Sequence, residues 1–224
     1  FRSWVLPLFP FAAKTFALPI IILAVVGMIY ASLIAIKQDD IKRLIAYSSI
    51  AHIGLMAAAI FAGGELGLQG VQVQMFNHGI NVIGLWILAN AIESTLGTRK
   101  LSELGGLATK APTMAILLVV LAFANIALPL TNAFIGEFLL FNGLFQYNIW
   151  IAAVAGVSII LGAVYTLQMV QKVLFGEVSA VTANATEINA YSKWVLIVIV
   201  VFVIVLGVYP QPLIDLTKDS VNAL

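Results

Sequence analysis

Long apolar stretches separated by short polar segments dominate the sequence. A helix needs about 20 mainly apolar residues to cross the roughly 30 Å hydrocarbon core of a bilayer. Six stretches are long enough, at 16–36, 44–62, 71–92, 112–145, 149–175 and 191–209. They are continuously apolar and lack the alternation of a membrane β-barrel. We therefore expect an all-α, polytopic integral membrane protein with about six transmembrane helices.

The fourth stretch is too long for one crossing helix. At 1.5 Å per residue, residues 112–145 would extend for about 51 Å. Pro129 also removes a backbone donor and clashes with the preceding turn. We expect two half-helices, at 113–127 and 133–145, joined by an unwound segment at Pro129. Broken helices of this kind recur at the ion and substrate sites of transporters.

A polar, weakly patterned segment divides the chain into unequal parts. We expect a membrane bundle of five spans over residues 1–176, a loop over 177–190, and a last span with a short interfacial tail over 191–224. Because the sequence begins with Phe1 instead of methionine, we also expect a fragment or a processed chain.

Composition supports the membrane assignment, and charge predicts the orientation. The chain is 62% hydrophobic and 9% charged, whereas soluble domains contain about 25% charged residues. Eight basic residues lie in loops on one side of the predicted spans: Lys37, Lys42, Arg43, Arg99, Lys100, Lys110, Lys172 and Lys193. Only Arg2, Lys14 and Lys218 lie on the other side. By the positive-inside rule, the first group faces the cytoplasm or matrix, and both ends of the chain face outside.

Glu137 is the only charged residue in the fourth stretch. A carboxyl group at membrane depth is costly and is usually retained for function. Gly136 precedes it and permits another backbone to come close. A buried, neutral carboxyl group with no role in transport is the alternative, but we favour a proton-carrying role.

The third span carries a polar stripe. Gln74, Asn77, His78 and Asn81 follow i, i+3, i+4, i+7 spacing, so they share one helical face. Such a face must meet other helices or water. It serves either as interhelical hydrogen bonding alone or as a proton path, and we favour the path for His78.

His52 lies near the middle of the second span. Histidine gains and loses a proton near physiological pH, so it suits a relay. The alternative is a neutral imidazole bonded to a neighbouring hydroxyl group. Lys42 and Asp40 belong to the charged loop 37–43, which is either a topology anchor or, alternatively, a proton entrance or a contact with a neighbouring subunit.

Several classes of chemistry are excluded by the residues present. The chain has no cysteine, which excludes disulfides and thiolate metal sites. No glycine-rich phosphate loop, haem or iron–sulfur ligand set, or nucleophile triad occurs, and nothing indicates nucleic-acid binding. Any redox chemistry must therefore take place on other chains.

Four motifs carry a resemblance to a known family. Residues 40–54, DIKRLIAYSSIAHIG, resemble the signature of the antiporter-like proton-pumping subunits of respiratory complex I. The resemblance continues with Asn-His-Gly at 77–79, with Leu-Pro at 128–129 followed by Gly-Glu-Phe at 136–138, and with Tyr-Pro-Gln-Pro at 209–212. Sibling subunits and multisubunit cation/proton antiporters usually carry lysine where this chain has Glu137. The acid resembles the chain M, or subunit 4, type.

The resemblance implies a fold and a relay. It implies a 14-span subunit with two inverted five-span repeats, of which this chain supplies the second repeat plus one further span. It implies that His52, His78 and Glu137 form the proton relay. The expected supporting residues are Gln74, Asn77, Asn81, Tyr165, Lys42 and Asp40. The family's glutamate and two lysines of the first repeat are not in this chain, and Asn77 replaces a residue that is often small in relatives.

The resemblance also implies a biochemical setting. It implies proton translocation by a non-redox subunit of a proton-translocating NADH:quinone oxidoreductase. NADH, FMN, iron–sulfur clusters and quinone would bind partner subunits, with no cofactor or metal on this chain. The expected partners are other membrane-arm subunits, including sibling antiporter-like subunits, and the lipid bilayer. The expected location is the bacterial inner membrane or, alternatively, the mitochondrial inner membrane.

Three other functions remain open from the sequence. The chain could belong to a multisubunit cation/proton antiporter or to a proton-pumping membrane hydrogenase. It could also be a purely structural membrane arm without transport. The glutamate at position 137, where antiporters usually have lysine, disfavours the first of these.

Overall fold

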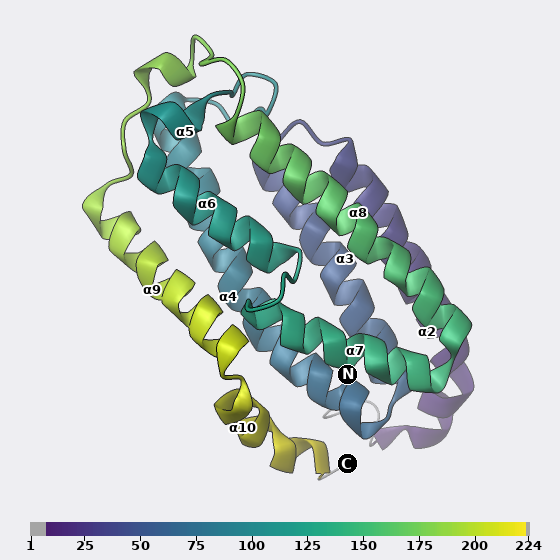
Figure 1. The fold of residues 1–224 in the computed structure, drawn as a ribbon. Helices are drawn as coiled ribbons and strands as arrows, with labels where there is room; N and C mark the ends of the chain where they lie inside the picture. Colours follow the sequence, from purple (N-terminus) through teal and green to yellow (C-terminus); the bar gives the residue numbers. More distant parts are fainter. Residues whose placement is uncertain (1–7, 223–224) are drawn as a thin grey trace.

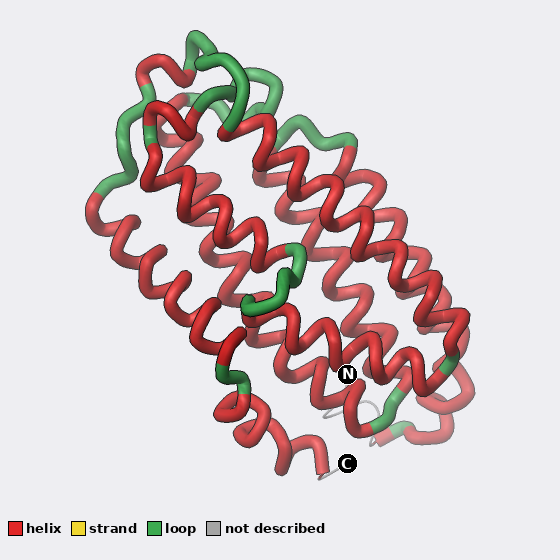
Figure 2. Tube along the Cα trace, viewed as in Figure 1, coloured by secondary structure: helices red, strands yellow, loops and turns green. Residues whose placement is uncertain are grey.

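Helices account for the regular structure of the chain. A computed structural model describes residues 8–222, and within this range it contains helices and no strand (Figures 1 and 2). The helices are α2 Pro10–Ile36, α3 Ile41–Ala62, α4 Glu65–Leu96, α5 Leu107–Lys110, α6 Pro112–Asn125, α7 Asn132–Tyr147, α8 Ile149–Leu174, α9 Ala190–Val208 and α10 Gln211–Asn222, with a 3-10 turn at Thr182–Asn184. The expected all-α fold is confirmed.

Within the described range, five helices are long and apolar enough to cross a membrane: α2, α3, α4, α8 and α9. The helices α6 and α7 are each shorter and follow one another in the chain. The number of six spans therefore stays a prediction. The helix α4 exceeds its predicted range of 71–92 because glycines with positive φ bound it, Gly64 (77°) before it and Gly97 (71°) after it.

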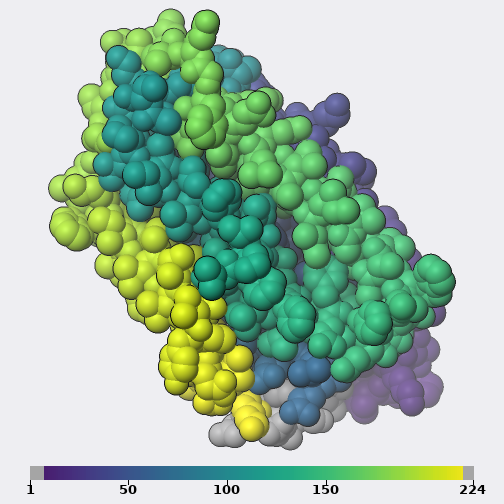
Figure 3. All heavy atoms as spheres, viewed as in Figure 1, coloured from purple at the N-terminus to yellow at the C-terminus, as the bar shows by residue number. Residues whose placement is uncertain are grey.

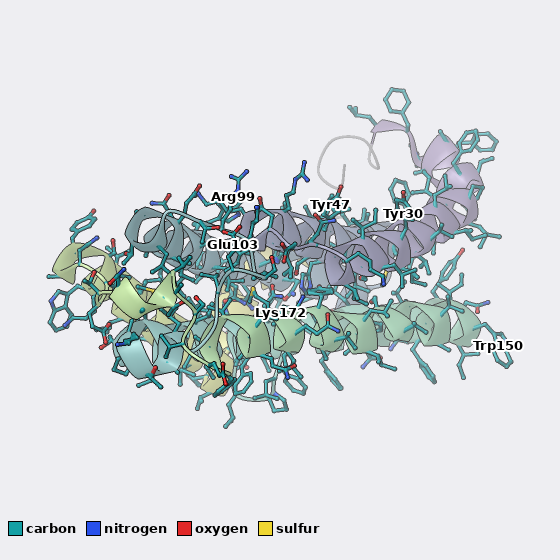
Figure 4. All side chains as sticks on the ribbon, turned by 90° about the horizontal axis from the view of Figure 1, so that it is seen from above. Tyr30, Tyr47, Arg99, Glu103, Trp150 and Lys172 are labelled. Carbon is teal, nitrogen blue, oxygen red and sulfur yellow. The ribbon has the colours of Figure 1, made fainter. Side chains whose placement is uncertain are left out.

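The long helices form one bundle in which neighbours in space are often distant in sequence. The helix α2 packs on α3 and α8, while α4 packs on α3 and α7. The helix α9 lies along α6 and α7 on one flank, and α10 continues from it (Figure 3). Trp150 and Lys172 mark the two ends of α8 (Figure 4).

Two apolar clusters fill the bundle and leave a polar layer between them. One cluster lies toward the α5 end and includes Leu88 and Leu121, and the other includes Met28 and Leu140. Along α4, the sequence passes from the second cluster at Val71 through the polar stripe to the first cluster, which begins at residue 85. The polar side chains are thus enclosed by apolar packing on both sides.

The segment predicted as a loop over 177–190 is packed on the bundle. Ile188 is 7% exposed, and the backbone N–H of Thr113, at the start of α6, donates to Glu187 Oε1 at 2.9 Å. Where the segment leaves α8, the carbonyl oxygen of Phe175 accepts a hydrogen bond from the N–H of Gly106, which precedes α5, at 3.1 Å. The division of the chain at this loop stays a prediction.

Asp40 secures the start of α3. Its Oδ1 accepts hydrogen bonds from the N–H groups of Lys42 (2.9 Å) and Arg43 (3.1 Å). Its Oδ2 lies 2.6 Å from Arg99 Nε. An isolated antiparallel β-bridge also pairs the backbones of Asp40 and Lys100. The charged loop thereby joins α3 to the segment that follows α4.

Replacing Asp40 with alanine should lower the free energy of unfolding by about 1 kcal/mol, because α3 loses its side-chain cap. Asp40→Asn should lose much less. It retains a capping oxygen, and an ion pair with the 49% exposed Arg99 side chain adds little. Denaturation of the purified full-length subunit in detergent, followed by circular dichroism, measures both variants. Equal losses would contradict the capping role.

Candidate functional site

The break between α6 and α7 shapes the site (Figure 2). The helix α6 ends at Asn125 and α7 begins at Asn132. Between them, Ala127 (φ 52°) and Leu130 (φ 76°) adopt left-handed conformations, which are unfavourable for residues other than glycine. The predicted first half-helix, 113–127, therefore ends two residues too late. Pro129 lies inside the connection, four residues beyond the last residue of α6, so the helix does not end at the proline.

Asparagines of α4 hold this break in place. Asn77 Nδ2 donates to the carbonyl oxygen of Asn132 at 2.8 Å, and Asn132 Nδ2 donates back to the carbonyl oxygen of Asn77 at 3.5 Å. One turn farther along, Asn81 Nδ2 donates to the carbonyl oxygen of Ala124 at 3.4 Å. The polar stripe thus ties α4 to both sides of the break, to the last turn of α6 and to the first residue of α7.

Glu137 lies where α3, α4 and α7 meet, and it is 7% exposed. Its Oε1 is 3.0 Å from His52 Nδ1 of α3 and accepts a longer bond, 3.4 Å, from Gln74 Nε2 of α4. The His78 ring lies 4.9 Å from the His52 ring, centroid to centroid. The structure therefore brings His52, His78, Glu137 and Gln74 into one cluster.

The absence of a side chain at Gly136 permits this close approach. A Cβ atom there would lie 2.9 Å from Gln74 Cβ and 3.0 Å from its Cα. Another α7 glycine, Gly143, packs against the Gly67 backbone of α4. Small residues let helix backbones approach closely within membranes, so these glycines set the position of Glu137 against the stripe.

The cluster has unused hydrogen-bonding capacity. Four buried atoms have no hydrogen-bond partner among the described residues: His52 Nε2, Gln74 Oε1, Asn77 Oδ1 and Asn81 Oδ1. A cavity of about 20 Å³ adjoins His52 and Glu137, and Tyr165 and Asn125 also line it. This is enough room for one water, and these four side chains bring polar groups to a wall that also contains apolar residues.

Some residues of the site were not foreseen from the sequence. Asn125 and Asn132 flank the break, and Ser48 and Thr166 contact Asn125. Each is a polar residue within an apolar stretch, which is the signal that singled out Gln74 and Asn77. Ser48 also lies one helical turn before His52 on α3. The same criterion applied to every span would have found them.

Lys42 and Asp40 lie apart from the cluster. Lys42 Nζ pairs with Glu93 Oε2 at 2.5 Å and donates to Asn90 Oδ1 at 3.3 Å. Its position on α3 is ten residues from His52, or about 15 Å along the helix axis. The contacts of Lys42 and Asp40 are those of an anchor between α3 and the end of α4.

The cluster has the groups needed for proton exchange. It combines a carboxyl group, two imidazoles and amides that hold them. Residues 8–222 contain no group of three or more His, Cys, Asp or Glu side chains that could hold a metal ion. Proton transfer between positioned acids and bases is the chemistry that this arrangement supports.

Comparison with known proteins shows similarity over the whole chain. The family described as "NADH:quinone oxidoreductase/Mrp antiporter, TM" matches residues 3–162. NADH-quinone oxidoreductase subunit M of Rhodobacter capsulatus is 37% identical, over 100% of this chain and 44% of that protein. The corresponding protein of Pseudomonas aeruginosa is 35% identical, over 98% of this chain and 43% of its own length. The chain spans about half the length of the curated relatives it matches.

Solved structures show the same relationship. A chain of respiratory complex I from Thermus thermophilus superposes with a TM-score of 0.89 and 28% identity, covering 99% of this chain and 48% of that chain. A chain of the Mrp complex from Dietzia superposes with a TM-score of 0.86 over 93% of this chain and 47% of that chain. At 19% identity, the second match shows a shared fold alone.

Proposed function

Because this chain belongs to the family of membrane subunits of NADH:quinone oxidoreductases and Mrp antiporters, we propose that it carries protons across the membrane as a pump subunit of an NADH:quinone oxidoreductase. The resemblance inferred from the motifs is confirmed at the level of the family. With its spanning helices and bacterial relatives, the chain is a multi-pass protein of the bacterial inner membrane.

The observation that carries the proposal is the 3.0 Å contact between His52 Nδ1 and Glu137 Oε1 within the polar layer. An imidazole can take up a proton at one nitrogen and release one from the other. A proton that reaches His52 from the side of His78 therefore has a direct acceptor in Glu137. Gln74 holds the carboxyl group in place by its hydrogen bond.

Energy must reach the relay from outside this chain. Moving one charge against 100 mV requires about 2.3 kcal/mol. In the proposed function, electron transfer in partner subunits supplies it through charge shifts along buried groups. NADH, FMN, iron–sulfur clusters and quinone bind those partners. This chain contributes no thiolate ligand, since it has no cysteine. Its direct neighbours are other membrane-arm subunits, including sibling antiporter-like subunits.

A multisubunit cation/proton antiporter is the second candidate function. The matching family includes the Mrp antiporters, and the Mrp complex shares the fold. Glu137 favours the oxidoreductase, since the antiporter subunits that the chain resembles usually carry lysine there. Both candidates use the same cluster to move protons, but they differ in the driving reaction.

Purification of the full-length subunit from its native membrane separates the two candidates. We expect NADH-binding and quinone-binding subunits to copurify, and NADH oxidation by the complex to drive proton movement in vesicles. Copurification of small antiporter subunits, with cation-driven proton exchange and no NADH oxidation, would overturn the proposal and support the second candidate.

A further inference from the structure

A second polar network lies beside the histidine–glutamate cluster. Ser48 Oγ of α3 is 3.0 Å from the hydroxyl oxygen of Tyr165 of α8, and either atom can be the donor. Asn125 Nδ2, at the end of α6, donates to Ser48 Oγ at 3.1 Å and to Thr166 Oγ1 at 3.1 Å. None of the four residues is more than 6% exposed. The network therefore joins three helices without competition from bulk water.

The small cavity links this network to Glu137. Tyr165 and Asn125 of the network line it together with His52 and Glu137. Its volume of about 20 Å³ holds one water. A water there can connect the Tyr165 hydroxyl group to the Glu137 carboxyl group, which is the natural acceptor of a donated hydrogen bond when it is ionised.

The network can be arranged in two directions. In one, Ser48 donates to Tyr165, so the Tyr165 proton points into the cavity. In the other, Tyr165 donates to Ser48, and Ser48 donates to Asn125 Oδ1, which lies 3.4 Å away. The Tyr165 hydroxyl oxygen then faces the cavity as a hydrogen-bond acceptor. The heavy atoms keep their places in both arrangements, because only hydroxyl protons rotate.

We propose that the Tyr165–Ser48–Asn125 network is a hydrogen-bond switch that reverses direction when Glu137 gains or loses its proton. An ionised Glu137 selects the arrangement in which Tyr165 donates into the cavity. A protonated Glu137 donates through the water and selects the reverse. The switch deepens the proposed function and rests on it, since it requires Glu137 to change its protonation state. Tyr165 and Ser48 are positioning residues in this scheme.

The other groups that face Glu137 are few. The helix α3 supplies His52, which contacts the carboxyl group directly. The helix α4 supplies the neutral Gln74 and, behind His52, the imidazole of His78. The helix α6 has no titratable residue, and those of α9 lie at its first residues, away from Glu137. Besides His52 and Glu137, Tyr165 of α8 is thus the titratable side chain that borders the cavity.

The switch connects the charge on Glu137 to the broken helix. Asn125 is the last residue of α6, and the left-handed Ala127 follows two residues later. In the arrangement for a protonated Glu137, Ser48 gives Asn125 an additional hydrogen bond. The end of α6 is therefore held more firmly when Glu137 is protonated than when it is ionised. The position of this half-helix can thus depend on the protonation state of Glu137.

Infrared difference spectroscopy of the complete complex tests the switch. The Glu137 carboxyl band is identified by its loss in Glu137→Gln. We expect Tyr165→Phe to move this band to higher frequency, because the water that bonds to the carboxyl group loses its hydroxyl partner. Ser48→Ala should move the band as well, because the Tyr165 hydroxyl group then loses the partner that sets its direction. Proton translocation should fall about fivefold in Tyr165→Phe, the effect of one net hydrogen bond.

Ser158→Ala is the matched control. Ser158 also lines the cavity, but its hydroxyl group donates to the carbonyl oxygen of Ala155 at 2.7 Å, within its own helix. We expect the Glu137 carboxyl band to keep its frequency in Ser158→Ala. An unmoved band in Tyr165→Phe, an equal shift in Ser158→Ala, or no band lost in Glu137→Gln would each overturn the switch. If Glu137→Gln removes the band but leaves proton translocation intact, the proposed function fails while the band positions still decide on the switch.

Discussion

Gly136→Ala should destabilise the bundle by about 1–3 kcal/mol, the usual loss on overpacking a tight core. The new Cβ atom would lie 2.9 Å from Gln74 Cβ and 3.0 Å from Gln74 Cα. Because Gln74 Cα belongs to the α4 backbone, a rotamer change cannot relieve the contact. Either α7 moves away from α4 or the helices distort. Both outcomes displace Glu137 from Gln74 and His52, so proton transport should fall along with stability.

Gly156→Ala is the control for this prediction. Gly156 lies within α8, and a Cβ atom there meets nothing within 4 Å. The substitution should be neutral or should stabilise the helix by up to about 1 kcal/mol, since alanine is the better helix former. Unfolding of the two full-length variants in mixed detergent micelles gives the comparison. Equal stability of both variants would show that the α4–α7 contact is looser than the structure indicates.

The faces of individual helices could be predicted from the sequence. The spacing of Gln74, Asn77 and Asn81 placed them on one side of α4, and all three are buried there. The polar character of His52 and Glu137 within apolar stretches singled them out. These inferences depend only on the helical repeat and on the cost of burying polar groups, both of which are local properties.

Contacts between helices could not be predicted in the same way. No sequence rule indicates that His52 Nδ1 meets Glu137, because that contact depends on how α3 and α7 pack. The end of α6 was misplaced for a related reason. Alanine has no local preference for the left-handed conformation that Ala127 adopts. Tertiary contacts of the break, including those from Asn77 and Asn81, hold that conformation.

The ends of α4 show a different limit. The hydropathy pattern located the apolar part at 71–92, but the helix runs over Glu65–Leu96. Its first and last turns carry polar residues such as Glu65 and Glu93, which resemble loop residues by composition. Glycine caps on both sides would have indicated the full length. Composition identifies the part of a helix that lies in lipid, and capping residues identify where it ends.

Glu137→Gln should have the largest effect on transport. Glutamine preserves the size of the side chain and can still hydrogen-bond to Gln74 and His52, so the fold should remain. It cannot bind and release a proton, however, and the loss of a positioned acid or base typically slows proton transfer by about 10²–10⁴-fold. Protons that pass through this subunit should therefore no longer cross the membrane.

Two further variants sharpen the interpretation. Glu65→Gln removes a carboxyl group from the exposed start of α4, and it should leave transport unchanged. Glu137→Lys introduces the residue that siblings usually carry. Retained transport in Glu137→Lys would show that any titratable group suffices at this position. Lost transport would show that the contact with His52 requires an acid.

The number of protons moved per electron, measured with the complete complex in sealed vesicles, tests the central claim most directly. We expect a lower ratio for Glu137→Gln than for the wild type, with Glu65→Gln equal to the wild type. A wild-type ratio in Glu137→Gln would contradict the account, because a side chain that carries the proton cannot be replaced by one that does not titrate.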